Sequence, residues 1–216
     1  MPTSYTPDFF DPLSTDRLAH TICETFERQP MVSMVEDTPP FDGSGLYAIY
    51  YRGTTIAAYR PLADLQIPVY VGQALSSNSA TGKAVTSKRP LRNRIRDHRR
   101  SIVGADLPIN EFRFRALRLP DVHTNLGEDG LRVGYQPVWN SVLNGFGSHE
   151  QGQSTRKSKK SKWDTFHEGR DRTHGGDAHD PEQLAAEVAA KIDQQVTNYH
   201  SMPWPHPEQP LYLDLD

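Results

Sequence analysis

Two tyrosines and a basic segment carry the residue types best suited to chemistry on an anionic substrate. Tyr47 and Tyr70 each belong to a short run of aromatic and branched residues. Arg94 and His98 are four positions apart in a strongly basic segment, so they would share one face of a helix. A guanidinium group offers a planar pair of donors that fits two phosphate oxygens, and a neutral imidazole can accept a proton from a tyrosine hydroxyl. These groups can act together only if two strands and a helix meet.

The two tyrosines are expected in neighbouring strands. The runs cover residues 46–51 and 67–71, and turn residues follow each of them. This composition between turn residues is typical of short buried strands. Two such strands could pair and bring the tyrosines near one another. Gly45 and Gly72, which have no Cβ, would let backbone or substrate come close.

The basic segment predicts a helix from Pro90 to about Val103. Proline suits the first turn of a helix, and Gly104 can end it. The apolar positions, which form one narrow stripe, are Leu91, Ile95 and Ile102. Most of the remaining helix surface is therefore expected to be charged.

Periodicity and breaker residues predict the other elements. We expect helices over residues 14–28, 121–135 and 182–199, a strand over 111–119, and an edge strand over 211–214. The strand over 111–119 alternates, which predicts one wet, basic face carrying Arg113, Arg115 and Arg118. Residues 30–44 are expected to be a loop, and residues 138–140 an extended or turn segment.

Composition limits the class of protein. The chain has 216 residues and a formal net charge of −3, and 36% of its residues are hydrophobic, which suits one domain with elaborations. No apolar run approaches the roughly 20 residues of a membrane span, and the N-terminus lacks signal-peptide features. The only cysteine, Cys23, excludes an intrachain disulfide and a cysteine-rich zinc site. We therefore expect a cytoplasmic protein.

The charges are segregated along the chain. Residues 83–100 hold eight Lys or Arg and one acid, and residues 156–162 hold five Lys or Arg and none. A basic face on a mildly acidic protein suits a polyanion partner. Residues 144–180 also place isolated aromatics in a basic, Gly- and Ser-rich segment, which suits a nucleic-acid-facing loop. The alternative is a solvated helix face and a flexible loop.

The order of these residues resembles the GIY-YIG nuclease superfamily. Gly45-Leu46-Tyr47 and Tyr70-Val71-Gly72 correspond to the two tripeptides of its name, with Leu46 and Val71 in place of isoleucine. Arg94, Glu128 and Asn140 follow in the order of that superfamily. The resemblance implies an α/β (α+β) fold with a small three-stranded sheet flanked by helices. It further implies a single domain over 1–216 with three parts: an N-terminal arm and helix (1–43), a catalytic core (44–142) and a C-terminal DNA-facing loop and helix (143–216).

The resemblance implies roles for the core residues in hydrolysis of a phosphodiester. Tyr47 would be the general base, Tyr70 would position water or phosphate, and Arg94 would hold the phosphate. His98 would accept a proton from a tyrosine.

The same resemblance implies a metal site. Glu128 would hold Mg²⁺, for which Mn²⁺ can substitute, with Asp129 as the alternative ligand. A single carboxylate can suffice because Mg²⁺ keeps several waters and also binds substrate phosphate. Asn140 would donate to a phosphate oxygen or fix the ends of the strands.

A narrower likeness extends beyond the core. The Arg94–His98 pair, the insertion before that helix, and residues 145–149 and 161–170 resemble the type II GIY-YIG restriction endonucleases that cut CCGCGG. This implies double-stranded DNA as substrate, Mg²⁺ and a homodimer that matches a palindrome. The candidate DNA-binding residues are Lys83, Arg89, Arg92, His149, Arg156, Lys159, Lys162 and Arg170. The alternatives are a nicking or repair-type nuclease and a non-catalytic DNA-binding protein on the same fold.

Overall fold

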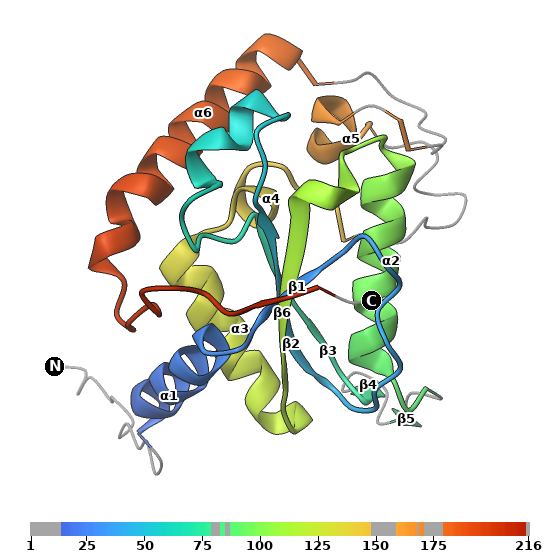
Figure 1. Cartoon of the computed structure of the whole chain (residues 1–216), viewed down its shortest axis with the longest axis vertical. Coiled ribbons are helices and arrows are strands. Elements are labelled where there is room, and N and C mark those ends of the chain that lie inside the picture. The colour runs from blue at the N-terminus through green and yellow to red at the C-terminus, as the bar shows by residue number, and fades with distance from the viewer. Residues whose placement is uncertain are drawn as a thin grey trace, which may run out of the picture.

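A twisted sheet crosses the centre of the protein and helices cover both of its faces (Figure 1). The structure, a computed structural model, describes residues 14–78, 83–84, 87–147, 159–167, 169–170 and 179–214. The sheet has five strands in the order β3-β2-β6-β1-β7. Its strands are β1 (Met31–Ser33), β2 (Gly45–Tyr51), β3 (Tyr70–Ala74), β6 (Phe112–Arg118) and β7 (Tyr212–Leu213). A separate short ribbon pairs β4 (Ser77–Asn78) with β5 (Lys83–Ala84).

The helices largely follow the predicted segments. They are α1 (Thr15–Glu27), α2 (Pro90–Gly104), α3 (Asp121–Tyr135), α4 (Val138–Ser141), α5 (Lys162–Phe166) and α6 (Pro181–Asn198). Short 3₁₀ turns are η1 (Ala57–Leu62), η2 (Ile109–Glu111) and η4 (Tyr199–Ser201). The predicted apolar stripe of α2 is confirmed, since Leu91, Ile95 and Ile102 are all buried. None of the helices in the described residues is long and apolar enough to cross a membrane.

The predicted fold class is confirmed, but the sheet is larger than the three strands expected. The expected strands β3, β2 and β6 are consecutive in the sheet, beginning at its β3 edge, with β2 antiparallel to both neighbours. Residues 30–44 were expected to be a loop, yet they contain β1, which pairs with β6. The predicted edge strand near the C-terminus is confirmed as β7, which pairs parallel to β1. Three residues of β1 are too few to give a sequence pattern.

Strand β2 is buried along its whole length because helices cover both sides of the sheet. On one side Tyr47 reaches His98 of α2, and on the other Leu46 lies against Gly127 of α3. Successive residues of a strand point to opposite faces. Tyr47 therefore faces α2, whereas the side chains of residues 46 and 48 face α1 and α3.

Gly45 and Gly72 are required by close approach, as their lack of a Cβ suggested. Gly45 has φ 153°, and a Cβ there would lie 2.0 Å from the carbonyl oxygen of Leu117. Gly72 is paired with Tyr47 across the strands, and its Cβ would lie 2.4 Å from the Tyr47 hydroxyl. The second glycine therefore makes room for the tyrosine that the first tripeptide supplies.

The prediction of a wet, basic face on β6 is wrong at Arg115. Its side chain is fully buried in an ion pair with Glu27 of α1, and it also donates to the side-chain oxygen of Gln66. Tyr135 donates its hydroxyl to the other oxygen of Glu27 at 2.8 Å. Because a buried charge needs a partner, the arginine and the glutamate fix α1 against the sheet.

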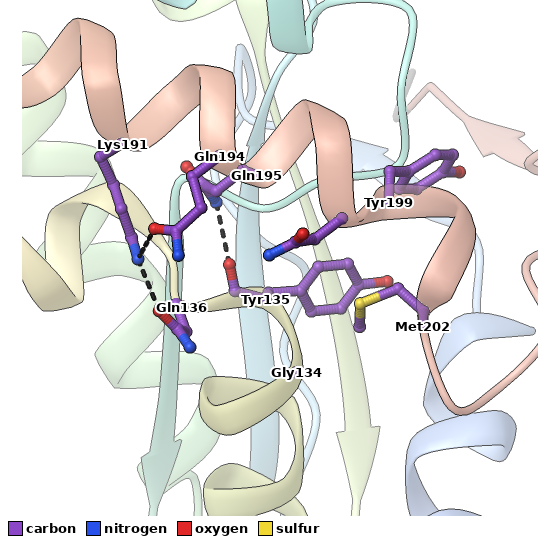
Figure 2. Close-up of a pocket in the computed structure, with 9 residues that line it drawn as sticks. Gly134, Tyr135, Gln136, Lys191, Gln194, Gln195, Tyr199 and Met202 are labelled. Atoms are coloured by element: carbon purple, nitrogen blue, oxygen red, sulfur yellow. Dashed lines mark hydrogen bonds between the residues drawn. The ribbon is translucent and has the colours of Figure 1, made fainter.

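The C-terminal helix α6 is tied to the end of α3 by polar side chains (Figure 2). Lys191 donates to the side-chain oxygens of Gln136 at 2.6 Å and Gln194 at 2.9 Å, and Gln195 donates to the backbone oxygen of Tyr135 at 3.1 Å. The hollow between them measures about 10 Å³, roughly the room of one water. This contact is therefore a polar joint between helices.

Two local predictions after residue 137 are also wrong. Residues 138–140 are not extended but begin the short helix α4, which follows Pro137. The aromatics Phe146 and Trp163 do not face outward, because they are 1% and 0% exposed within the core. Residue 163 belongs to α5, whose N-terminus is capped by the Ser161 hydroxyl.

Candidate active site

The centre of the candidate site is a tyrosine–histidine pair between β2 and α2. The hydroxyl oxygen of Tyr47 lies 2.6 Å from Nε2 of His98, and both side chains are 1% exposed. The rings are 5.2 Å apart between centroids. This short hydrogen bond gives the phenol proton a direct route to an imidazole nitrogen when that nitrogen is unprotonated.

Tyr70 and Arg94 complete the group on this side of the sheet. The Tyr70 ring lies 6.1 Å from that of Tyr47 and 5.0 Å from that of His98. Arg94, one turn before His98 on α2, is hydrogen-bonded to Tyr47 and donates through Nη2 to the backbone oxygen of Gly147 at 2.5 Å. The structure therefore brings together all four residues expected from the two strands and the helix.

Burial keeps the Tyr47 phenol protonated. Loss of hydration raises its pKa well above the usual range, Tyr70 raises it further, and Arg94 lowers it in part. A free phenolate is therefore disfavoured at neutral pH. Any role of Tyr47 as a base has to pass its own proton onward, and His98 is the neighbour able to receive it.

Glu128 lies on α3, on the other side of the sheet, and reaches the edge formed by β3. It is half-buried and accepts a hydrogen bond from the side chain of Gln73. Burial raises the pKa of its carboxyl group, Arg132 and Arg94 lower it, and Asp129 raises it. The charge of Arg94 thus acts on both Tyr47 and Glu128, so the site wraps around the edge strand. Asp129, the alternative ligand, is exposed.

The carboxylate of Glu128 is suited to bind a hard cation as its single protein ligand. Within the described ranges, no cluster of three or more His, Cys, Asp or Glu side chains is present. Glu128 could hold a hard cation such as Mg²⁺, which takes oxygen ligands and keeps waters, with further ligands from substrate phosphate. A partly desolvated carboxylate gains from such a neighbour because its charge is incompletely compensated.

Asn140 holds the backbone of β3. Its Oδ1 accepts from the amide of Val71 at 2.8 Å, and its Nδ2 donates to the carbonyl oxygen of the same residue at 2.9 Å. Of the two roles considered for Asn140, these contacts match fixing the strand ends. These two hydrogen bonds fix β3, the strand that carries Tyr70, Gly72 and Gln73.

Sequence reasoning missed three residues at the site: Gln73, Phe146 and Gly147. Gln73 touches Glu128, and the other two cover Tyr70, Arg94 and His98. The signal available for Gln73 was its position directly after the second tripeptide. The glycine at 147 was visible in the Gly-Phe-Gly run, but nothing in the sequence indicated what it approaches.

The candidate DNA-binding residues are dispersed. Lys159 is exposed, and Arg89 makes a surface ion pair with Asp42. Lys162 pairs with Glu187 at 2.6 Å. Lys83 belongs to the short strand β5. His149 and Arg156 fall outside the described residues.

Two of these candidates are engaged within the fold. The side chain of Arg92 is 15% exposed; it donates to the carbonyl of Thr38 at 2.9 Å and pairs with Asp37 at 3.2 Å. Arg170 is 6% exposed and pairs with Asp164. These contacts give both arginines a structural role, since they hold loops against helices.

The geometry agrees with a comparison against protein families. Residues 39–199 match the model of the Eco29kI GIY-YIG domain. This chain belongs to that family. No curated protein gives a match. As a member of the Eco29kI GIY-YIG domain family, the chain is a restriction-type DNA endonuclease. The predicted membership of the GIY-YIG nuclease superfamily is confirmed, and both tripeptides lie within the matched residues.

Proposed function

We propose that this endonuclease is a type II restriction enzyme that cuts both strands of the palindrome CCGCGG in a Mg²⁺-dependent reaction. The observation that carries the proposal is the 2.6 Å bond between Tyr47 and His98 beside the guanidinium of Arg94. A base, a proton acceptor and a phosphate-binding cation are then within reach of one phosphodiester. Glu128 at the neighbouring strand edge supplies the carboxylate for the metal.

Tyr47 and His98 act as a proton relay in the proposed reaction. A water attacks phosphorus, and the Tyr47 oxygen takes a proton from that water. The hydroxyl proton of Tyr47 passes at the same time to Nε2 of His98. The phenol is thus neutral before and after the step, so the raised pKa of Tyr47 is compatible with its role as base.

Arg94 and the metal balance the negative charge of the reaction. The planar donors of Arg94 bind non-bridging phosphate oxygens as charge develops on them. Glu128 would hold a Mg²⁺ ion, which would supply charge stabilisation for the attacked phosphate and the leaving oxygen. Tyr70 positions the water or the phosphate. The P–O bond to the leaving oxygen breaks as the bond to the water oxygen forms.

A homodimer with one active site in each subunit fits a palindromic site. Two-fold symmetry of the protein then matches two-fold symmetry of the DNA, and each subunit cuts one strand. Arg and Lys side chains are the usual partners of guanine O6 and N7 in the major groove, which suits a G·C-rich sequence. Exposed Lys159 is the described residue that we favour for DNA contact.

The test is cleavage of a plasmid that carries one CCGCGG sequence, with Mg²⁺ or with EDTA, by the wild type and by Glu128→Gln. We expect one linear product with ends at that sequence, lost with EDTA and in the variant, while the variant still binds DNA. Linear product with ends elsewhere would discard the site and keep the enzyme class. Random nicks would favour a repair-type nuclease, and binding without cutting would favour a non-catalytic protein. Full activity of Glu128→Gln would remove the metal role from this residue.

A further inference from the structure

Residues 145–147, which have no assigned role, cover the catalytic side chains. The Phe146 ring is stacked on the imidazole of His98, with 4.5 Å between centroids and 17° between planes. The same ring meets Tyr70 edge-on at 5.1 Å. Phe146 is 1% exposed, so it closes one side of the imidazole to water. Nε2 of His98 is then shielded beside the Tyr47 hydroxyl.

Gly147 contacts the site through its backbone. Its carbonyl oxygen accepts the hydrogen bond from Nη2 of Arg94 at 2.5 Å. A Cβ at this position would lie 2.5 Å from the Tyr70 hydroxyl and 3.1 Å from Nη2 of Arg94. The first distance is too short for any carbon–oxygen contact, so every other residue type would displace one of these side chains. The glycine is therefore required by space at the site.

The buried Arg170 also holds the backbone of residues 145–147. Arg170 donates to the backbone oxygens of Phe146 at 3.2 Å and Gly145 at 3.3 Å. Its guanidinium is fixed by the ion pair with Asp164 and lies 4.2 Å from the Trp163 ring centroid. Residues 145–147 are thus fixed between this buried arginine and the catalytic group. A rigid backbone is what can hold a long side chain such as Arg94 in one orientation.

We propose that Gly147 and Phe146 are positioning residues for the cleavage reaction: the Gly147 carbonyl sets the plane of Arg94, and the Phe146 ring sets the plane of His98. The inference rests on the proposed nuclease function of this site. An arginine has five N–H donors in a fixed plane, so one bond to a carbonyl orients the others. The remaining donors then face Tyr47 and the substrate phosphate. Neither residue touches the reacting atoms.

The decisive experiment compares Gly147→Ala with Gly104→Ala. Gly104 lies at the end of α2, where a Cβ would have no neighbour closer than 4.0 Å, so it is a matched control. For each variant we would measure the single-turnover rate of DNA cleavage, the DNA dissociation constant with Ca²⁺ in place of Mg²⁺, and the melting temperature. We expect Gly147→Ala to lose about 100-fold in rate, as for a misplacement of about 1 Å, with DNA affinity and melting temperature nearly unchanged. Gly104→Ala should cleave like the wild type.

A double-mutant cycle tests the route of the effect. Tyr70→Phe removes the oxygen that the new Cβ would meet, so Gly147→Ala should cost less in that background than in the wild type. An unchanged rate in Gly147→Ala would overturn the inference. So would a loss of rate matched by equal losses in DNA affinity and melting temperature, which is the result expected of a purely structural glycine. Absence of cleavage by the wild type would instead reject the proposed function.

Discussion

Two buried tyrosine–histidine pairs in this protein share one geometry and differ in their surroundings. In each pair the phenol oxygen lies 2.6 Å from Nε2 of the histidine, for Tyr47 with His98 and for Tyr59 with His167. Tyr59 also accepts a hydrogen bond from the indole N–H of Trp139 at 2.9 Å, and aromatic rings surround it. Tyr47 instead has Arg94 and Tyr70 beside it, with Glu128 at the adjacent strand edge.

The comparison shows that the pair alone does not make a catalytic site. Burial raises the pKa of both phenols, so neither is a base at rest. Each oxygen has a second donor from the protein, and the difference is its charge: at Tyr59 it is the neutral indole of Trp139, whereas at Tyr47 it is the guanidinium of Arg94, which we propose also binds the phosphate. We therefore assign chemistry to the first pair and stability to the second. The predictions below separate the two.

A large loss of rate is expected from His98→Gln. The amide oxygen of glutamine can accept the Tyr47 hydrogen bond, but it cannot take a proton. Loss of a general acid–base partner typically costs about 10²–10⁴-fold, so single-turnover cleavage should fall within that range. The matched change His167→Gln should leave the rate of the folded protein near that of the wild type. Equal rates for both variants would place the proton route elsewhere.

The second pair should instead control stability at acid pH. Burial, together with the charge of Arg170, lowers the pKa of His167 to about 3. The unfolded chain binds a proton near pH 6.5, and the folded protein does not until much lower pH. Stability is therefore fully present above pH 6.5 and is lost as pH falls toward 3. By linkage, the unfolding free energy should drop by about 2 kcal/mol from this residue between pH 7 and pH 5.

Urea unfolding at those two pH values, for the wild type and His167→Gln, would measure this contribution. The variant should show a smaller decrease than the wild type, because its side chain does not titrate. Identical decreases would mean that other groups account for the acid sensitivity.

The smallest effect is expected at Lys159 and Lys160, which belong to neither pair. Changing Lys159 and Lys160 to alanine should reduce the slope of log affinity against log salt by up to about 1.8, since each phosphate contact contributes about 0.9. Cleavage at saturating DNA should be nearly unchanged, in contrast to His98→Gln. Fluorescence anisotropy over a range of salt concentrations would give the slope. A slope equal to that of the wild type would place these lysines away from DNA.

The sequence was informative wherever a periodic pattern or an ordered motif extended over several residues. The apolar stripes predicted α2 and α6, and the two glycine–tyrosine tripeptides predicted the pair of strands β2 and β3 and their tyrosines. Local rules explain this success, because propensity and alternation are set by near neighbours. The order of Arg94, Glu128 and Asn140 then followed from the family resemblance.

The failures have a common physical cause, which is a partner distant in sequence. Arg115 reads as solvent-facing until Glu27, 88 positions earlier, is known to be buried against it. Phe146 and Trp163 read as isolated aromatics in a polar loop, yet they pack on Trp139 and on one another. The Gly147 carbonyl reaches Arg94 across 53 positions. Tertiary contacts of this kind leave no periodic signal.

The most direct test of the account compares Tyr47→Phe with Tyr59→Phe, measuring single-turnover cleavage of a duplex with one CCGCGG sequence and the melting temperature of each variant. We predict that Tyr47→Phe folds and binds DNA but loses cleavage. Tyr59→Phe leaves buried His167 and Trp139 without their partner, a cost of at least about 2 kcal/mol, which should lower the melting temperature by about 4–8 °C. Below that temperature it should cut like the wild type. Normal cleavage by Tyr47→Phe, or loss of cleavage by folded Tyr59→Phe, would contradict the assignment of chemistry to the pair between β2 and α2.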